Sequence, residues 1–483
     1  IIWLLLKVTV GQSVVAYQHV WVNQPSRLTK LSLAEDKEAK MYDKEFNILL
    51  QYAENKVDDM DIILSQGKNF SVQILNQNIE SYKNATVRGL GVRIKKDGKI
   101  GYAYSEDFSE ETLKSIVDEA IENSLIIEKE EMAIFDNYED KALEFSTYDE
   151  TLDTTDENLK IQLAKDLEKY AYEADPRVKN VTYAIYGDYS SYTKIANTKG
   201  LNKEARNNGA YAYTYLLVEE NGERRNAMEI KQSKNFADFN AKEISDKAVE
   251  KALNLLGDTQ IESGKYAVVF NNDMSSALLS TFSSIFSASA VHEGRSLLKG
   301  KKDQQIANPL VTIVDDARDE NGLSSFPFDS EGYPTQTTVL VEQGVLKSFL
   351  HNTVTAHEDK VKSTGNASRS YKSSLGISPS NLKLIPGMTK KEDLLTSAEK
   401  VLEVVSLAGL HSGANPISGD FSLSGEGFLY MNGEKQGSLS PFTISGNYLQ
   451  VLNNIEKIAN DFQYNSESVG SASILVNELN ISS

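Results

Sequence analysis

Alternating apolar and polar positions predict a strand-rich start to the chain, with strands at 61–64 and 70–75. Residues 87–104 are predicted to form two strands joined at Asp97-Gly98, a dipeptide typical of tight hairpin turns. Ser109 is expected to cap a helix, because the apolar residues after it recur at helical spacing. That stripe consists of Leu113, Ile116, Val117, Ala120 and Ile121.

A second unit with a similar pattern follows an acidic linker near 128–131. It begins with a predicted helix over 156–173, which has Leu159, Leu163 and Leu167 on one face. Residues 181–199 and 209–231 are predicted to form successive hairpins, with a type I′ turn at Asn221-Gly222. A helix over 242–256, stopped by Gly257, completes this unit.

Three tyrosines in the second hairpin share one face, because side chains alternate along a strand. They are Tyr211, Tyr213 and Tyr215. Aromatic side chains of this kind are able to stack against a bound peptide. Packing on a half-buried sheet is the favoured interpretation, since tyrosine is common in such strands.

The third unit begins with a predicted strand at 266–270 and a helix that Asp273 caps. This helix is expected to deliver 291–294, which include His292 and Glu293, near its end. Its apolar face consists of Leu278, Leu279, Phe282, Ile285 and Phe286. Later predicted elements are strands at 310–314 and 381–385, helices at 390–401 and 448–459, and a hairpin turn at Asn432-Gly433.

These patterns predict an α+β fold, with N-terminal sheet-and-helix units followed by a strand-rich mixed C-terminal domain. The predicted units are an N-terminal extension at 1–40, α+β units at 41–130 and 150–257, and a β-rich domain at 262–483. At 483 residues, the chain is long for one hydrophobic core, which favours several packed units.

The N-terminal residues 1–40 stand apart from this pattern. Their first six residues are apolar, far fewer than the roughly 20 that a membrane span needs. A basic region and a small-residue cleavage site, expected of a secretory signal, are not evident. We therefore expect an upstream extension or a mis-assigned start, with an N-terminal strand as the alternative, and no membrane association.

Charge and residue usage narrow the possible functions. The net charge of −19 disfavours nucleic-acid binding, which needs a basic surface to displace counterions from phosphates. The absence of cysteine excludes disulfides, thiol nucleophiles and thiolate ligands, and agrees with a cytoplasmic location. Any imidazole-based site must draw on five histidines: His19, His292, His351, His357 and His411.

The most informative stretch is 322–369. A turn-rich acidic loop holds Phe328, Asp329, Glu331 and Gly332, and a predicted hairpin follows at 338–341 and 345–350 with Gly344 at its turn. A small-residue loop at 363–367, expected to present mostly exposed donors, comes next. Its central residues are Thr364, Gly365 and Asn366. Two loops beside one hairpin are a typical way for a scaffold to display a site.

The segments SSFPFDSEG, LVEQGVLKSFL and KSTGNASR, in this order, resemble the TldD/PmbA family, and within it the TldE (PmbA) branch. The late segment FTISGNYL is similar to the family's T-I-A-G-N-L motif. The resemblance extends from about Met41 to the C-terminus. It implies a subunit of a heterodimeric metallopeptidase that cleaves unfolded or leader-bearing peptides.

In the TldD branch, the resemblance implies a His-Glu-x-x-x-His motif, whose histidines bind zinc and whose glutamate is the general base, completed by a later cysteine. His292 and Glu293 match its start, but Leu297 occupies the place of the second histidine and Ser296 excludes the shorter spacing. His357-Glu358 lacks a partner as well. Catalytic zinc needs about three protein ligands, so we expect no metal in this chain and zinc in its partner.

Other chemistry is less well supported. No nucleophile elbow or phosphate-binding loop is evident. Asp329 and Glu331 form a possible carboxylate pair, but two acids in a turn are more often solvated or bonded to nearby backbone amides. Distant histidines, including His351 and His411, could assemble a site only if the fold brings them together.

The sequence thus favours a non-catalytic TldE-like subunit that pairs with a TldD-like zinc peptidase, or with a second copy of itself. The loops at 326–334 and 363–369 are the expected lining of its substrate chamber or interface. Strand addition is the expected way of holding an extended peptide. The alternatives are an active zinc peptidase that uses His292 and Glu293, and a stand-alone peptide-binding protein.

Overall fold

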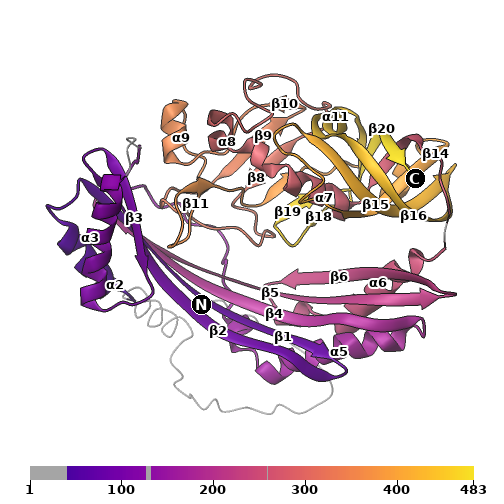
Figure 1. Ribbon diagram of the computed structural model, residues 1–483, viewed down its shortest axis with the longest axis horizontal. Coiled ribbons are helices and arrows are strands. Elements are labelled where there is room, and N and C mark those ends of the chain that lie inside the picture. The colour runs from indigo at the N-terminus through magenta and orange to yellow at the C-terminus, as the bar shows by residue number, and fades with distance from the viewer. Residues whose placement is uncertain (1–40, 127–131, 258) are drawn as a thin grey trace, which may run out of the picture. The chain divides into compact units, whose positions relative to one another are not determined.

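The computed structural model describes residues 41–126, 132–257 and 259–483. The predicted extension at 1–40 and the acidic linker near 128–131 lie outside these residues. The described part has the predicted α+β character, because its neighbouring strands are mostly antiparallel and its helices are grouped beside the sheets (Figure 1). Residues 45–483 form one compact unit. Within the described ranges, every helix is too short or too polar to cross a bilayer.

One long antiparallel sheet contains the strands of the first half of the chain, in the order β3-β2-β1-β4-β5-β6 (Figure 1). Positive φ at all four residues confirms the predicted turns at Asp97-Gly98 and Asn221-Gly222. The strands predicted at 61–64 and 70–75 are parts of one strand. The sheet consists of β1 (Asp59–Leu75), β2 (Asn78–Lys96), β3 (Lys99–Ser105), β4 (Val178–Asn197), β5 (Asn202–Glu220) and β6 (Glu223–Ser233).

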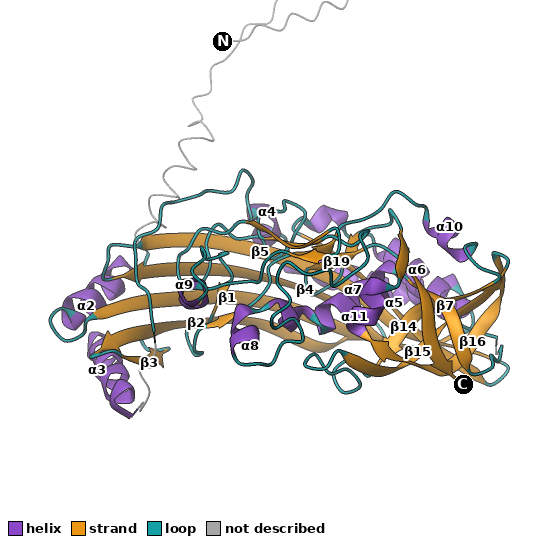
Figure 2. Cartoon of the chain, turned by 90° about the horizontal axis from the view of Figure 1, so that it is seen from above, coloured by secondary structure: helices purple, strands orange, loops and turns teal. Residues whose placement is uncertain are grey.

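Helices cover parts of this sheet. The helix after Ser109 packs so closely on β3 that a Cβ at Gly101 would lie 1.9 Å from the Ala120 carbonyl oxygen, and Figure 2 shows this helix at one end of the long strands. Leu163 and Leu167 are buried as predicted, but Leu159 is 56% exposed because it points away from the sheet. The helices are α2 (Asp43–Ala53), α3 (Glu110–Ile126), α4 (Glu150–Thr154), α5 (Glu157–Ala174), η1 (Phe236–Asp238) and α6 (Ala241–Asn254).

The C-terminal half forms two larger sheets and a two-stranded pair. Their orders are β10-β9-β8-β13-β19-β18, β16-β15-β14-β7-β20-β17 and β11-β12. Because β16 also pairs with β20, the strands β7, β14, β15, β16 and β20 close a ring.

The strands of the C-terminal half are β7 (Gly264–Phe270), β8 (Ile313–Asp316), β9 (Thr337–Glu342), β10 (Val345–Leu346), β11 (Ala367–Ser368), β12 (Gly376–Ile377), β13 (Leu382–Leu384), β14 (Lys400–Ala408), β15 (Asp420–Met431), β16 (Glu434–Asn447), β17 (Ile455–Ile458), β18 (Gln463–Tyr464), β19 (Val469–Ser471) and β20 (Ile474–Ser482).

The helices of this half are shorter than predicted. Asn271, rather than Asp273, caps the first of them, because its Oδ1 accepts a hydrogen bond from the Met274 amide at 2.9 Å. That helix ends before His292, which lies on a separate five-residue helix. The helices are α7 (Asn272–Thr281), η2 (Ser283–Phe286), α8 (Ala288–His292), α9 (Thr353–Glu358), α10 (Lys391–Leu395) and α11 (Tyr448–Asn453).

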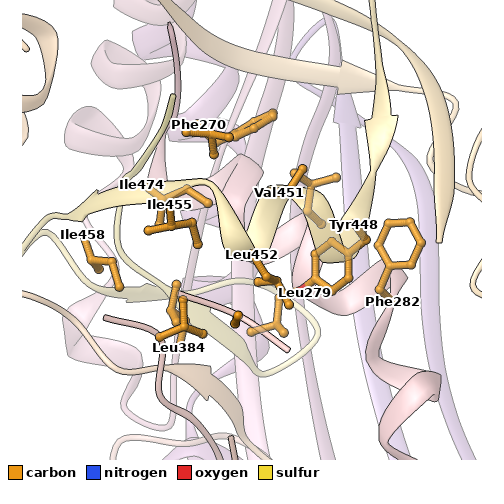
Figure 3. Close-up of a cluster of buried hydrophobic side chains, with 14 of the residues drawn as sticks. Phe270, Leu279, Phe282, Leu384, Tyr448, Val451, Leu452, Ile455, Ile458 and Ile474 are labelled. Atoms are coloured by element: carbon orange, nitrogen blue, oxygen red, sulfur yellow. The ribbon is translucent and has the colours of Figure 1, made fainter. Parts of the chain in front are cut away.

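A continuous hydrophobic core joins the C-terminal sheets to α7 and α11 (Figure 3). At its centre, the rings of Phe282 and Tyr448 stack with centroids 4.4 Å apart and an interplanar angle of 9°. Leu279, Val451 and Leu452 pack around them, and all five side chains are at most 3% exposed. This core supports the loops around 322–369.

Candidate functional site

Asp329 ties the two predicted loops together. Its Oδ1 accepts hydrogen bonds from the amides of Glu331 at 2.9 Å and Tyr333 at 3.0 Å, and its Oδ2 accepts one from Ala367 at 3.0 Å. Gly332 adopts a φ of +75°, and a Cβ there would lie 2.4 Å from Leu201, so the turn requires glycine. These hydrogen bonds fix the conformation of the first loop and connect it to the second.

A buried cluster of four charges connects the loops to the long sheet. Arg93 on β2 donates to Asp61 on β1 through Nε at 2.9 Å and pairs with Glu331 at 3.2 Å. Arg369 binds the other oxygen of the Asp61 carboxylate. Each of the four side chains is at most 8% exposed. Two cations and two anions balance, so the cluster is neutral as a whole.

Electrostatics within the cluster follow from burial and pairing. Burial by itself would lower the pKa of Arg93, but the carboxylates of Asp61 and Glu331 raise it overall. Burial, followed by the neighbouring Glu331 carboxylate, raises the pKa of Asp329. Glu331 also accepts hydrogen bonds from the Thr353 amide at 2.9 Å and its hydroxyl at 2.8 Å. The first turn of α9 is thereby attached to the same cluster.

The second loop is buried, in contrast to the expected exposed donors. Thr364 accepts a hydrogen bond from the His351 amide at 2.7 Å, and Asn366 donates to Asp315 at 2.7 Å. Gly365 has a φ of +74°, and a Cβ there would lie 2.7 Å from the Pro334 carbonyl oxygen. The small residues are needed because the two loops pack directly on each other.

Both loops line one cavity of about 420 Å³. Phe328 and Asp329 from the first loop and Gly365 and Asn366 from the second contribute to its wall, opposite residues of β1, β4 and β5. The cavity lining does not include Glu331, Gly332 or Thr364. These residues contribute to the contacts that hold the loops in place. The residues singled out in the two loops thus form one structure between the long sheet and the C-terminal half.

His292 and Glu293 are both engaged by charged side chains near the surface. Both ring nitrogens of His292 contact carboxylates at 2.8 Å, Nδ1 that of Glu358 and Nε2 that of Asp359. Glu293 pairs with Arg295 and accepts from the Ser289 hydroxyl at 2.9 Å, contacts that lower its pKa. These contacts join α8 to α9.

The described residues around His292 do not present the ligand set of a catalytic zinc ion. Gly294 has a φ of +73° directly after α8, so position 297 does not follow on one helical face with His292. Leu297 packs against the hydrophobic core. In residues 41–126, 132–257 and 259–483, no three histidine, aspartate or glutamate side chains converge in a metal-binding arrangement.

The remaining described histidines are only partly brought together. The buried His351 lies with its Nε2 4.0 Å from Asp359, which also contacts His292, and its Nδ1 lies 3.2 Å from the Thr355 hydroxyl. His357 is exposed on α9. His411 lines a different and larger cavity.

Acidification is expected to weaken the fold through His351. Burial lowers its pKa to about 4, whereas the unfolded chain titrates near 6.5. The unfolded state therefore takes up the proton first, so stability is complete above about pH 6.5 and falls as the pH approaches 4. Compared with the wild type, His351→Gln should lose less unfolding free energy between pH 7 and pH 4.5, by up to about 3 kcal/mol.

Urea unfolding at several pH values measures this difference. His357→Gln, on the helix α9 that follows His351, is the matched control and should keep the wild-type pH dependence. Equal pH dependence in the wild type and His351→Gln would rule out a buried neutral imidazole.

A larger cavity of about 1730 Å³ lies between β6 and the C-terminal ring. Among the described residues, β6 pairs only with β5, so its other edge faces this cavity without a neighbouring strand. Tyr215 lines the cavity, while Tyr211 and Tyr213 stack on each other with centroids 6.3 Å apart, which supports packing as their main role. The sequence pattern did not predict this cavity, because it cannot identify which strand ends the sheet.

Sequence analysis also missed Asp61, Arg93 and Arg369. A signal was present for the first two, since each interrupts an apolar strand that would otherwise be buried. Charged residues at such positions are almost never fully buried without a partner. No comparable signal marks Arg369, which follows a loop of small residues.

Comparisons with known proteins give consistent results. Family models of the PmbA/TldA metallopeptidases match residues 60–124 (domain 1), 150–256 (central domain) and 263–483 (C-terminal domain). The chain is 30% identical over 390 residues to an uncharacterized protein of Methanocaldococcus jannaschii, covering 80% of this chain and 88% of that protein. It is 24% identical over 451 residues to metalloprotease PmbA of Escherichia coli O157:H7, covering 92% and 96%.

Solved structures share the fold. A crystal structure of a proposed DNA-gyrase modulator from Thermotoga maritima superimposes with a TM-score of 0.85 at 32% identity, covering 91% of this chain and all of that one. TldE from Thermococcus kodakarensis gives a TM-score of 0.83 at 20% identity, again over 91% of this chain and all of the other. At that identity, the second likeness concerns the fold alone.

Proposed function

This chain belongs to the PmbA/TldD metallopeptidase family, and from that premise we propose that it is the TldE-like, non-catalytic subunit of a complex with a TldD-like zinc peptidase. The substrates of the complex are extended peptides or unfolded proteins. In this proposal the partner holds the zinc ion, and this chain contributes the handling of the substrate.

The engagement of His292 and Glu293 is the observation that carries the proposal. A zinc ligand needs a free nitrogen lone pair, and a general base needs a free carboxylate close to the metal-bound water. Both nitrogens of His292 contact carboxylate oxygens, so neither is open toward a metal ion. A ring engaged at both nitrogens supports a role in fastening α9, in place of a role as ligand.

The edge of β6 supports a role in peptide handling. An extended peptide is able to add to an unpaired strand through main-chain hydrogen bonds, which require no particular side chains. Such an edge is usually covered or shortened in a stable protein, since it also promotes aggregation. Here β6 is 11 residues long and borders a cavity large enough for a peptide segment.

The charge cluster supports a role for the loops as a rigid wall. Arg93, Asp61 and Arg369 anchor both loops to the long sheet, so their exposed portions are held in place before any partner or substrate binds. Pre-organised surfaces lose less entropy on binding. We propose that 326–334 and 363–369 line the substrate chamber or the interface with the partner.

Reconstitution with a TldD-like chain tests the proposal. We expect hydrolysis of an unstructured fluorescent casein substrate by the mixture, sensitivity of that hydrolysis to a zinc chelator, and no hydrolysis by this chain alone. Because His292 holds α9 and no metal, His292→Ala should leave the activity of the mixture unchanged. Chelator-sensitive hydrolysis by this chain alone, abolished in His292→Ala, would instead identify it as an active peptidase.

A further inference from the structure

The cavity of about 420 Å³ is lined by polar side chains of the long sheet and by aromatic side chains of the first loop. Three hydroxyl-bearing side chains of the long sheet line it, Ser65 on β1 with Thr193 and Tyr189 on β4. The rings of Phe326 and Phe328 lie on the loop side, with centroids 5.5 Å apart in an edge-on arrangement. This volume lies within the range of about 300–1,000 Å³ that is typical of small-ligand sites.

Asn207 on β5 lines this cavity and holds a hydrogen-bond acceptor without a partner in the described part of the chain. Its amide nitrogen donates to the Leu323 carbonyl at 3.3 Å, but its Oδ1 is buried without a partner in the described part of the chain. The residue is only 8% exposed. Leaving such an atom unsatisfied costs free energy, so its retention in a lined cavity points to a ligand that donates a hydrogen bond.

The charges around the cavity are already satisfied. Among the described lining residues, only Asp329 and Arg369 belong to the acidic and basic residue types. The first accepts three backbone hydrogen bonds, and the second is paired with Asp61. Burial also raises the pKa of the Tyr189 phenol, which keeps it neutral. A charged ligand would therefore find no counter-ion, whereas a neutral ligand would find several hydroxyl groups.

We propose that this cavity binds an uncharged amide, in the form of a short stretch of polypeptide main chain, with one N–H donating to Asn207 Oδ1. Main-chain amides supply donors and acceptors in alternation, which hydroxyl groups are able to complement in either direction. Small apolar side chains of the bound segment would face Phe326 and Phe328. The inference extends the proposed peptide-handling function to a second subsite, separate from the edge of β6.

Calorimetric titration of the full chain with N-acetyl-trialanine amide, a neutral blocked peptide, tests the inference. We expect saturable binding, and about fivefold weaker binding to Asn207→Leu, since one net hydrogen bond is lost. Unblocked trialanine, which carries both terminal charges, should bind more weakly than the blocked peptide to the wild type. Asn202→Leu, an exposed position at the start of β5, is the matched control and should bind like the wild type.

A thermal unfolding measurement without peptide separates binding from folding. Leu has a similar volume and removes the unsatisfied acceptor together with the 3.3 Å hydrogen bond to Leu323, so Asn207→Leu should unfold close to the wild-type temperature. Absence of saturable binding, equal affinity of Asn207→Leu and the wild type, or equal affinity for blocked and unblocked trialanine would overturn the inference. These binding results do not depend on the partner, so they are distinct from a failure of reconstituted hydrolysis.

Discussion

Arg93→Ala is expected to lower the free energy of unfolding by about 3–5 kcal/mol, because it leaves the buried Glu331 without a cation and Asp61 with one in place of two. Arg93 is 1% exposed and contacts both Asp61 and Glu331. Water cannot stabilise these carboxylates as well as the guanidinium does, because the sheet and the loops enclose the site. Arg369 would remain on Asp61, but Glu331 would keep only its hydrogen bonds from Thr353.

Urea unfolding monitored by far-ultraviolet circular dichroism measures this loss of unfolding free energy. The matched control is Arg88→Ala on the same strand, where the guanidinium is exposed and lies over the Phe108 ring with 4.7 Å to its centroid. That change should alter stability by no more than about 0.5 kcal/mol, as is usual for surface positions. A similar small effect for Arg93→Ala would show that the cluster does not hold the loops.

The cluster also links stability to the proposed function. If the loops form part of the chamber or interface, a variant that releases them should weaken association with the partner as well. The two effects have one cause, since Glu331 belongs to the first loop and Arg369 ends the second. The fold therefore positions the candidate site through charge pairs between distant parts of the sequence.

Local patterns predicted the elements that depend on neighbouring residues. Asp97-Gly98, Asn221-Gly222, Asn432-Gly433 and Gly344 all occupy turns with positive φ, because these dipeptides and glycine tolerate that conformation. Local periodicity likewise predicted the alternating strands and the helices α3, α5 and α6. The spacing of apolar side chains in these elements indicates the buried face, even when the element that packs against it is unknown.

Predictions failed where tertiary pairing decides the structure. The helix predicted over 390–401 ends at Leu395, and residues 400–408 form β14, which pairs with β7 and β15. Apolar residues at 401, 402 and 404 fit either period, and the strand is stabilised by neighbours far away in sequence. The helix predicted over 448–459 likewise ends at Asn453, because the following residues form β17 against β20.

In the candidate site, too, the local elements were predicted but the contacts between distant residues were not. The loops at 326–334 and 363–369 were identified from turn residues and family resemblance, but their contacts were not. Glu331 pairs with Arg93 across 238 positions of sequence, and Arg369 with Asp61 across 308. No local pattern encodes such pairs, although an isolated charge in an apolar strand indicates that a partner exists.

Leu297 stands at the position where the sequence lacks a second histidine after His292. Introducing it by Leu297→His should not create a zinc site, because Gly294 turns the chain after α8 and position 297 lies in the core contact of that segment. His292 would still be held by Glu358 and Asp359. Two imidazoles bind zinc together only where the backbone places them on one side of the ion.

Zinc content of the purified full chain, measured by elemental analysis after dialysis against zinc-containing buffer, is the most direct test of the central claim. We expect far less than one zinc per chain for the wild type, for His292→Ala and for Leu297→His, and one zinc per complex once a TldD-like partner is bound. One tightly held zinc per wild-type chain in the absence of a partner, lost in His292→Ala, would contradict the account.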